Sequence, residues 1–240
     1  MWSICKKELR QFFSSLTGYL AIAVFLLFMG LFLFVFPETS ILDYGFATMD
    51  KFFDLAPWVL LLLIPAITMR SFSEEFKSGT YELLKTKPFT SGQIIGGKYW
   101  ASFIVATISL LPSLLYVFTI HQLIVKGNID TGGIAGSYIG LFMLVAAFTA
   151  IGICCSALTD NVVISFLTAA MGCFIFYNGF EALSRIAAFK GNVDYYLEQV
   201  GISNHYKSMS RGLIEAKDLI YFLITICLFL LITKRQLIKK

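Results

Sequence analysis

Long apolar stretches without a single charged side chain alternate with short polar connections along this chain. Six windows contain no Asp, Glu, Lys or Arg, and they cover residues 11–37, 55–69, 99–125, 131–159, 161–180 and 219–233. A helix that crosses a lipid bilayer needs about 20 mostly apolar residues. Four windows reach that length. The two shorter ones reach it only when the aromatic residues before one of them, and the apolar part of a lysine side chain at the end of the other, are included. The pattern therefore predicts six transmembrane helices, at about 19–36, 52–70, 99–123, 135–156, 162–180 and 218–233.

The residues before the first apolar window alternate apolar and basic side chains. Apolar positions recur through residues 2–16, with Lys6, Lys7 and Arg10 between them. This alternation is typical of an amphipathic helix on a membrane surface, so we expect an interfacial helix at 2–16. A cleaved signal peptide is the alternative. It is disfavoured because the apolar run exceeds the roughly 7–15 residues of such peptides, and no small-residue cleavage site precedes Pro37.

Composition indicates a membrane protein rather than a soluble one. Apolar residues make up 58% of the 240 residues and charged residues 14%, against the ~25% of ordinary soluble domains. The mean hydropathy is +0.77. The segments between the apolar windows are near or below the size at which a chain folds unaided, which argues against a separate soluble domain. The chain is therefore predicted to be an all-α membrane protein with a single domain over residues 1–240.

The charged residues are distributed unequally between the two sides of the predicted bundle. If the N-terminus is cytoplasmic, the cytoplasmic segments hold 12 of the 19 basic residues and 5 of the 15 acidic ones, a net charge of +7. The outer segments, with 7 basic and 10 acidic residues, carry −3. An excess of Lys and Arg on the cytoplasmic side is the rule for membrane proteins. We therefore expect both termini in the cytoplasm, with the basic tail facing anionic lipid rather than nucleic acid.

Two short sequences come close to catalytic motifs but lack a required residue. Residues 92–98 match a phosphate-binding loop, yet Tyr99 stands where a Ser or Thr must bind magnesium, and a membrane helix follows. The glutamate pair at 74–75 is similar to that of intramembrane metalloproteases, but His121 and His205 are both expected near the outer surface. The five cysteines lack the spacing of a zinc site. We therefore expect no catalytic residue, no metal site and no cofactor bound by this chain.

One polar segment, residues 71–92, stands out because most other connections are short. Phe72, Phe76 and Leu83 fall near one face at helical spacing, and acidic residues precede the lysines, which suits the helix dipole. Gly79 weakens the middle of this helix. A short helix with both an apolar ridge and charges is typical of a docking element for a soluble partner. A solvated loop, or a helix lying on the lipid surface, is the alternative.

The same segment resembles the coupling segment of ABC-2 type transporter permeases. In that family acidic residues come first, then Gly-Thr, a leucine pair, a proline, and Gly-Lys before the third span. The matching residues here are Glu74 and Glu75, Gly79 and Thr80, Leu83 and Leu84, Pro88, and Gly97 and Lys98. The interfacial start, the six spans and the long outer segment 181–217 are also similar, so the resemblance covers essentially the whole chain. In finer details, which include the sequence NHYKSMSRGLIEAKDLIYF at residues 204–222, the chain is most similar to the gliding-motility-associated permeases of Bacteroidetes.

The resemblance implies a permease subunit of the bacterial inner membrane, with six transmembrane helices, an N-terminal interfacial helix and a cytoplasmic coupling helix. It would have no ATPase activity of its own. Its partners would be a second permease chain, in a homodimer or heterodimer, and a cytosolic ABC ATPase that binds ATP and magnesium. In the gliding-motility group the ATPase is GldA-like, and a GldG-like membrane subunit is associated. The residues implied to contact the ATPase are Phe72, Glu74, Glu75, Phe76, Lys77, Gly79, Thr80, Leu83, Leu84 and Pro88.

Small residues recur in the predicted fourth helix, which favours close packing with other helices. They are Ala146, Ala150, Gly152 and Ser156. The long outer segment mixes polar and apolar residues as short interfacial helices do.

Two other functions stay open. One is a non-transporting membrane scaffold of a secretion or adhesion apparatus. The other is an ion-coupled secondary carrier, which is disfavoured because the predicted spans lack the ionisable residues of an ion pathway.

Overall fold

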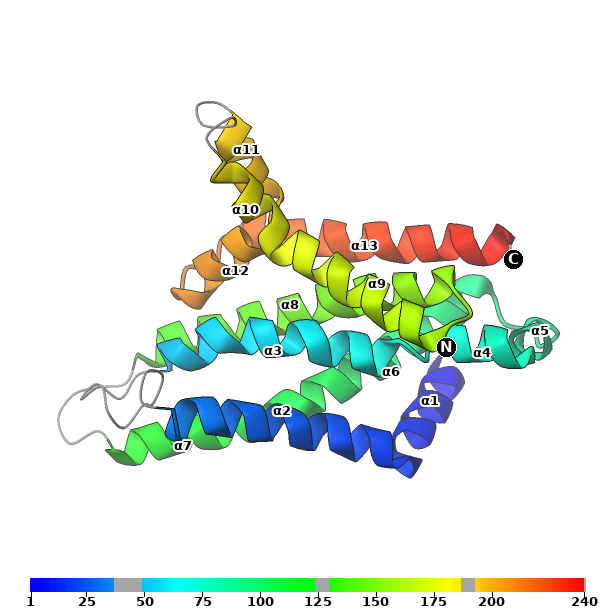
Figure 1. The fold of residues 1–240 in the computed structure, drawn as a ribbon, viewed down its shortest axis with the longest axis horizontal. Helices are drawn as coiled ribbons and strands as arrows, with labels where there is room; N and C mark the ends of the chain where they lie inside the picture. Colours follow the sequence, from blue (N-terminus) through cyan, green and yellow to red (C-terminus); the bar gives the residue numbers. More distant parts are fainter. Residues whose placement is uncertain (37–48, 124–129, 187–192, 240) are drawn as a thin grey trace.

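The computed structural model describes residues 1–36, 49–123, 130–186 and 193–239 (Figure 1). All regular elements in these ranges are helices: α1 (Trp2–Ser14), α2 (Leu16–Phe34), α3 (Asp50–Thr68), α4 (Ser73–Ser78), α5 (Thr80–Lys85), α6 (Ser91–Leu110), α7 (Leu114–Leu123), α8 (Thr131–Leu158), α9 (Val162–Phe174), α10 (Phe180–Ser184), α11 (Val193–Val200), α12 (Ile202–Ser210) and α13 (Ala216–Lys239). A 3₁₀ turn, Leu111–Ser113, joins α6 to α7, and a π-helical turn, Ile175–Gly179, joins α9 to α10.

Five helical stretches are long and apolar enough to cross a membrane. They are Asp50–Ser78, Ser91–Thr119, Thr131–Leu158, Val162–Ser184 and Ala216–Ile238. These stretches confirm the prediction of an all-helical, multi-pass membrane fold for the described part of the chain.

A bend of 69° between α1 and α2 separates the N-terminal amphipathic helix from a long apolar one, and the pair together would make a sixth crossing. Ser15 is extended between the two helices. At Gly18, a Cβ atom would lie only 2.6 Å from the carbonyl oxygen of Phe12. A larger residue at position 18 would therefore force α1 and α2 apart. The N-terminal helix ends at Ser14, slightly before the predicted boundary at residue 16.

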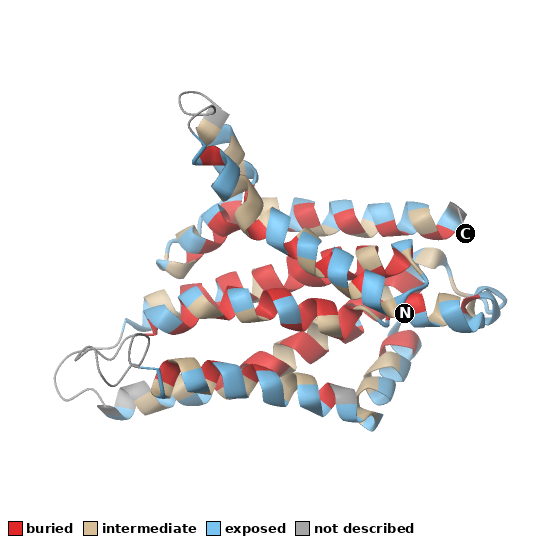
Figure 2. Ribbon diagram, viewed as in Figure 1, coloured by how far each residue is buried: buried red, intermediate tan, exposed pale blue. Residues whose placement is uncertain are grey.

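The long helices run side by side along the long axis of the molecule (Figure 1). Both termini lie toward one end of this axis, near α4 and α5 (Figure 1). The central helix is α8, which packs against α3, α6, α9, α12 and α13. The most apolar part of α8 is 83% buried, against 22% for the stretch that includes α9. Figure 2 accordingly shows most of the buried positions on the inner helices.

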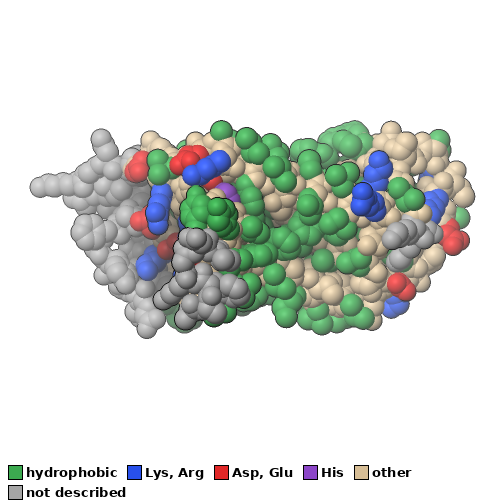
Figure 3. Space-filling view, turned by 90° about the horizontal axis from the view of Figure 1, so that it is seen from above, with side chains coloured by type: hydrophobic (Ala, Val, Ile, Leu, Met, Phe, Trp, Pro, Cys, Tyr) green, Lys and Arg blue, Asp and Glu red, His purple; other side chains and the backbone are tan. Residues whose placement is uncertain are grey.

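The outer surface of the bundle is apolar across its middle. In the face shown in Figure 3, hydrophobic side chains occupy the middle of the long axis and charged side chains lie toward the two ends. Outward-facing residues of α9 and α13, such as Leu167 and Leu223, are more than half exposed. Soluble proteins rarely expose large continuous apolar surfaces. A lipid bilayer would cover this one.

The third predicted helix begins earlier than expected, at Ser91 instead of Tyr99. The Thr90 hydroxyl accepts a hydrogen bond from the backbone N–H of Gln93, and the Gln93 side chain accepts one from the backbone N–H of Thr90. This reciprocal cap fixes the helix start. The end of segment 71–92 therefore forms the first turn of α6, and Lys98 lies inside the helix rather than at its edge.

Other helix ends also differ from the predictions. Pro112 lies in the 3₁₀ turn that interrupts the third predicted helix, because proline lacks the N–H that a continuous α-helix needs. The last helix continues beyond the predicted end at residue 233 to Lys239. The charged pair Lys234 and Arg235 ends the apolar run, so hydrophobicity alone did not include the residues that follow.

Segment 181–217, which the sequence predicts to lie outside the membrane, contains α11, α12 and most of α10. His205 of α12 joins this segment to the last long helix: its Nδ1 lies 2.7 Å from Asp218 Oδ1, and its Nε2 lies 2.9 Å from the Gln199 carbonyl oxygen. The His205 ring also stacks on Tyr221. These contacts fix α12 against the beginning of α13.

Candidate functional site

The coupling segment, residues 71–92, folds as two short helices, α4 and α5, instead of one. Gly79 separates them with a φ of 71°, in the left-handed region that glycine enters without strain. The Ser78 hydroxyl donates to the Glu74 carbonyl oxygen at 2.8 Å and lies 2.8 Å from the Thr80 hydroxyl across the turn. The two helices therefore form a defined corner at the end of the bundle near both termini (Figure 1).

One side of the coupling segment belongs to the core. Phe72 is fully buried, its ring stacks on Phe76, and Tyr81 meets both rings edge-on. The buried apolar cluster around Phe72 and Tyr81 also contains Ile4, Ile94, Ile95, Ile153, Ala157 and Leu237. Burial, with the nearby Glu75 carboxylate, raises the pKa of Tyr81, so this ring stays neutral. The inner side of the segment is thus fixed to α1, α6, α8 and α13.

The expectation that Phe72 and Leu83 share one outward ridge is wrong. Phe72 faces inward, whereas Leu83 is 66% exposed, and Phe76 and Leu84 are partly buried against the inner cluster. The left-handed turn at Gly79 interrupts the helix, so helical spacing does not carry across it. The predicted contact residues that remain exposed are Glu74, Lys77, Gly79, Thr80, Leu83 and Pro88.

Lys98 connects the coupling segment to two other helices. Its side chain is 1% exposed, and its Nζ lies 3.0 Å from Glu8 Oε1 of α1 and 3.0 Å from Glu75 Oε1 of α4. The same Nζ donates to the Ser71 carbonyl oxygen at 2.5 Å. Lys7 Nζ lies 3.3 Å from Glu75 Oε1. We call Lys7, Glu8, Glu75 and Lys98 the charge cluster.

The charge cluster contains two positive and two negative side chains and is therefore neutral overall. Burying an ammonium group costs several kcal/mol in free energy unless opposite charges and hydrogen-bond acceptors surround it. Two carboxylates and one backbone carbonyl meet this need for Lys98. Movement of α4 away from α1 or α6 would separate buried opposite charges, so the cluster holds these three helices together.

The sequence interpretation placed Lys98 just before the third predicted helix and did not identify Glu8 as a site residue. Lys98 is buried because α6 begins at Ser91, which puts residue 98 about two turns inside the helix. The pairing with Glu8 joins residues 90 positions apart and leaves no local pattern. One hint is that Glu8 is the single acidic residue in an otherwise basic amphipathic helix.

The small residues of α8 pack inside this chain. Ala146, Ala150, Gly152 and Ser156 are all buried. A Cβ atom on Gly152 would lie 2.1 Å from Thr68 Oγ1, so only glycine allows α8 and α3 to approach this closely.

Ser156 links α8 directly to the coupling segment. Its hydroxyl oxygen accepts hydrogen bonds from the backbone N–H groups of Phe72 and Ser73, at 2.9 and 3.2 Å, and its hydrogen is donated to the Met69 carbonyl oxygen. The side chain therefore satisfies backbone groups where α3 ends and α4 begins.

The exposed corner formed by α4 and α5 is fixed from behind to α1, α6 and α8. In the part of the chain that the structure describes, no group of three or more His, Cys, Asp or Glu side chains could hold a metal ion.

A scan against protein-family models gives no match, and a search of curated proteins also gives none.

Proposed function

We propose that this chain is the membrane-spanning permease subunit of an ATP-binding cassette transporter of the ABC-2 type, similar to the gliding-motility permease GldF. A separate cytosolic ATPase would close on ATP, and this chain would convert that closure into helix movement for export or for gliding-motility machinery. The observation that carries the proposal is the two-helix coupling segment, which exposes Leu83 and charged residues on one side and is fixed to the bundle on the other.

The contacts behind the coupling segment support a path for force. A partner pressing on Leu83 would act on Tyr81 and Phe72, which pack against α6, α8 and α13. The charge cluster would carry the same displacement to α1 through Glu8 and to α6 through Lys98. Because packed interiors resist compression, a displacement at the corner would move these helices rather than be absorbed locally.

The proposal includes six spans in a bacterial inner membrane, with α2 as the first, and both termini and the coupling segment in the cytoplasm. A thiol reagent that cannot cross membranes should label Lys217→Cys in intact cells, and should label Ser78→Cys only after permeabilisation. Both parent residues are exposed, and the unmutated chain measures the background from the five native cysteines. Labelling in the reverse pattern would exclude this orientation.

The proposed partners are a GldA-like ATPase, a second permease chain and a GldG-like membrane subunit, with ATP and magnesium bound by the ATPase alone. The experiment that separates a transporter from a membrane scaffold is ATP turnover after reconstitution. The ATPase encoded by a gene neighbouring that of this chain should hydrolyse ATP several-fold faster in vesicles that contain the chain than in empty vesicles. Turnover that is the same in both would favour the scaffold.

A further inference from the structure

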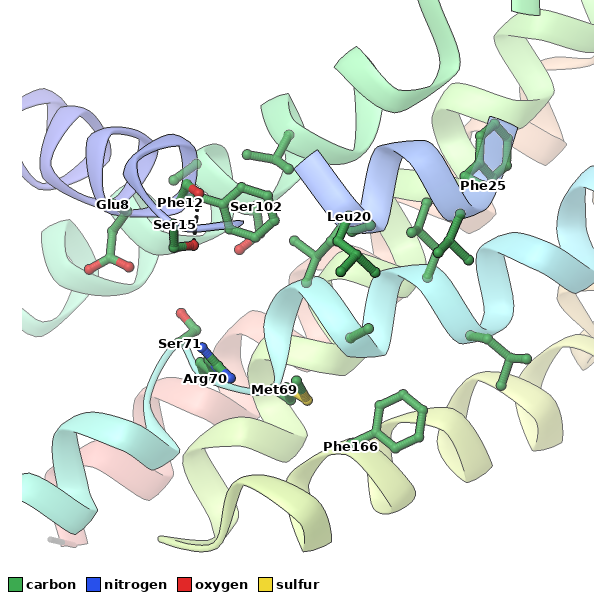
Figure 4. Close-up of a pocket in the computed structure, with 18 of the residues that line it drawn as sticks. Glu8, Phe12, Ser15, Leu20, Phe25, Met69, Arg70, Ser71, Ser102 and Phe166 are labelled. Atoms are coloured by element: carbon green, nitrogen blue, oxygen red, sulfur yellow. Dashed lines mark hydrogen bonds between the residues drawn. The ribbon is translucent and has the colours of Figure 1, made fainter. Parts of the chain in front are cut away.

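A groove of about 780 Å³ opens beside the charge cluster, between α1 and α2 on one side and α3 on the other (Figure 4). Residues of α6, together with Phe166 of α9, complete its walls. The volume lies within the range of about 300–1,000 Å³ that is usual for small-molecule sites. Glu8 and Ser71, which both contact Lys98, also line this groove.

The lining of the groove is divided between polar and apolar residues. Near one end are the polar residues Glu8, Gln11, Ser15, Arg70, Ser71 and Glu74. Beyond them the walls are formed mainly by large apolar side chains, including Leu20, Val24, Phe28, Trp58 and Leu62. Figure 4 shows Glu8, Arg70 and Ser71 at the polar end, with Leu20 and Phe25 farther along. This division matches an amphipathic ligand with a polar head and an apolar tail.

Three polar groups at the head end lack partners. Among the described residues, neither Arg70 nor Glu74 makes an ion pair; both are exposed, line the groove and lie four residues apart where α3 ends and α4 begins. Ser71 is 8% exposed, and its hydroxyl is buried without any hydrogen-bond partner. Buried polar groups in native proteins are usually satisfied, so the Ser71 hydroxyl has a hydrogen bond to offer a ligand atom in the groove.

We propose that the groove binds one glycerophospholipid whose headgroup carries a phosphate and a primary ammonium. The phosphate would accept hydrogen bonds from the Arg70 guanidinium and the Ser71 hydroxyl, because the guanidinium fork matches phosphate oxygens. The ammonium would pair with the Glu74 carboxylate. A purely anionic headgroup would face two glutamates, and a purely cationic one would leave Arg70 without a partner.

The position of the groove agrees with this ligand. The polar end of the groove lies beside α1 and α4, near both termini, and its apolar walls lie along α2 and α3. In a bilayer, the headgroup would lie at the polar end and the acyl chains along the apolar walls. A second copy of this chain is the other occupant to consider. Its apolar spans could cover the walls but would leave Arg70 and the Ser71 hydroxyl unpartnered. The lipid therefore accounts for more of the site.

Binding of the lipid can be tested by native mass spectrometry on the full chain, purified in detergent and depleted of lipid. Phosphatidylethanolamine and the anionic phosphatidylglycerol are then titrated separately. We expect one tightly bound phosphatidylethanolamine and weaker phosphatidylglycerol. Arg70→Gln should weaken phosphatidylethanolamine about tenfold, since hydrogen bonds between charged groups contribute that much. Ala21→Trp should abolish binding, because Ala21 lines the groove.

Matched controls lie outside the groove. Ala23→Trp changes an exposed alanine on the same helix, and Arg235→Gln changes an exposed arginine of the helix that ends near the same end of the bundle. Both should bind the lipid as the unmutated chain does. Equal binding by all variants, or tighter binding of phosphatidylglycerol, would overturn the proposal. The proposal would also be overturned if the unmutated chain is a dimer, Ala21→Trp dissociates this dimer, and lipid binding stays unchanged. If Ala21→Trp does not fold, the change in phosphatidylethanolamine binding caused by Arg70→Gln still tests the proposal. None of these readouts requires an ATPase, so the result is independent of the proposed function.

Discussion

Lys98→Met is expected to lower the free energy of unfolding by about 3–5 kcal/mol, the usual cost of removing one partner from a buried ion pair. Lys98 is 1% exposed, and without its ammonium group the carboxylates of Glu8 and Glu75 would face each other in a largely buried site. One carboxylate oxygen of Glu75 is already buried without a hydrogen-bond partner. Thermal unfolding in detergent, monitored with size-exclusion chromatography, measures the effect.

A triple variant separates the charge effect from a general packing defect. Lys98→Met combined with Glu8→Gln and Glu75→Gln removes the three buried charges of the cluster and leaves only Lys7, whose side chain is 56% exposed. Most of the lost stability should therefore return. Lys87→Met is the matched control, because Lys87 is exposed in the same segment. If Lys98→Met unfolds at the same temperature as Lys87→Met, the charge cluster does not hold α1, α4 and α6 together.

Leu83→Asp is expected to weaken binding of the proposed ATPase by a factor of about ten or more without destabilising this chain. Apolar anchors usually dominate protein interfaces, and losing one costs on the order of 2 kcal/mol. Leu83 is 66% exposed, so an aspartate there leaves the core intact. Binding is measured by the amount of ATPase that co-purifies with the tagged chain, and folding is measured by its elution from size-exclusion chromatography.

The matched control is Leu213→Asp, which changes a leucine of similar exposure, 60%, just before the last helix. It should retain the ATPase fully. Phe76→Ala and Glu75→Lys are poorer tests, because Phe76 packs on the buried Phe72 and Glu75 belongs to the charge cluster. Full ATPase retention by Leu83→Asp would show that the exposed leucine is not an anchor.

The apolar windows predicted the helical fold well because length and hydrophobicity directly reflect the thickness of a bilayer. Each predicted helix overlaps a helix in the structure, and five of the six correspond to stretches long and apolar enough to cross a membrane. The ends were less predictable. The cap formed by Thr90 and Gln93 lies in a polar stretch, where hydrophobicity carries no signal.

The inner side of the candidate site could not be predicted, because it depends on contacts between distant parts of the chain. Phe72 is buried by Ile153 and Leu237, and the Lys98 ammonium is neutralised by Glu8. Within residues 71–92 alone, Phe72 and Leu83 look equivalent. The exposed positions of Glu74, Lys77 and Thr80 were easier to anticipate, since polar side chains stay in water unless a partner is buried with them.

Co-purification of the proposed ABC ATPase with the unmutated chain tests the proposed function most directly. The two proteins are co-expressed, extracted in mild detergent and purified through a tag on this chain alone. The account predicts that the ATPase elutes with the chain in equal amounts, and that Leu83→Asp releases it while Leu213→Asp does not. An ATPase that elutes separately from a correctly folded, unmutated chain would contradict the account.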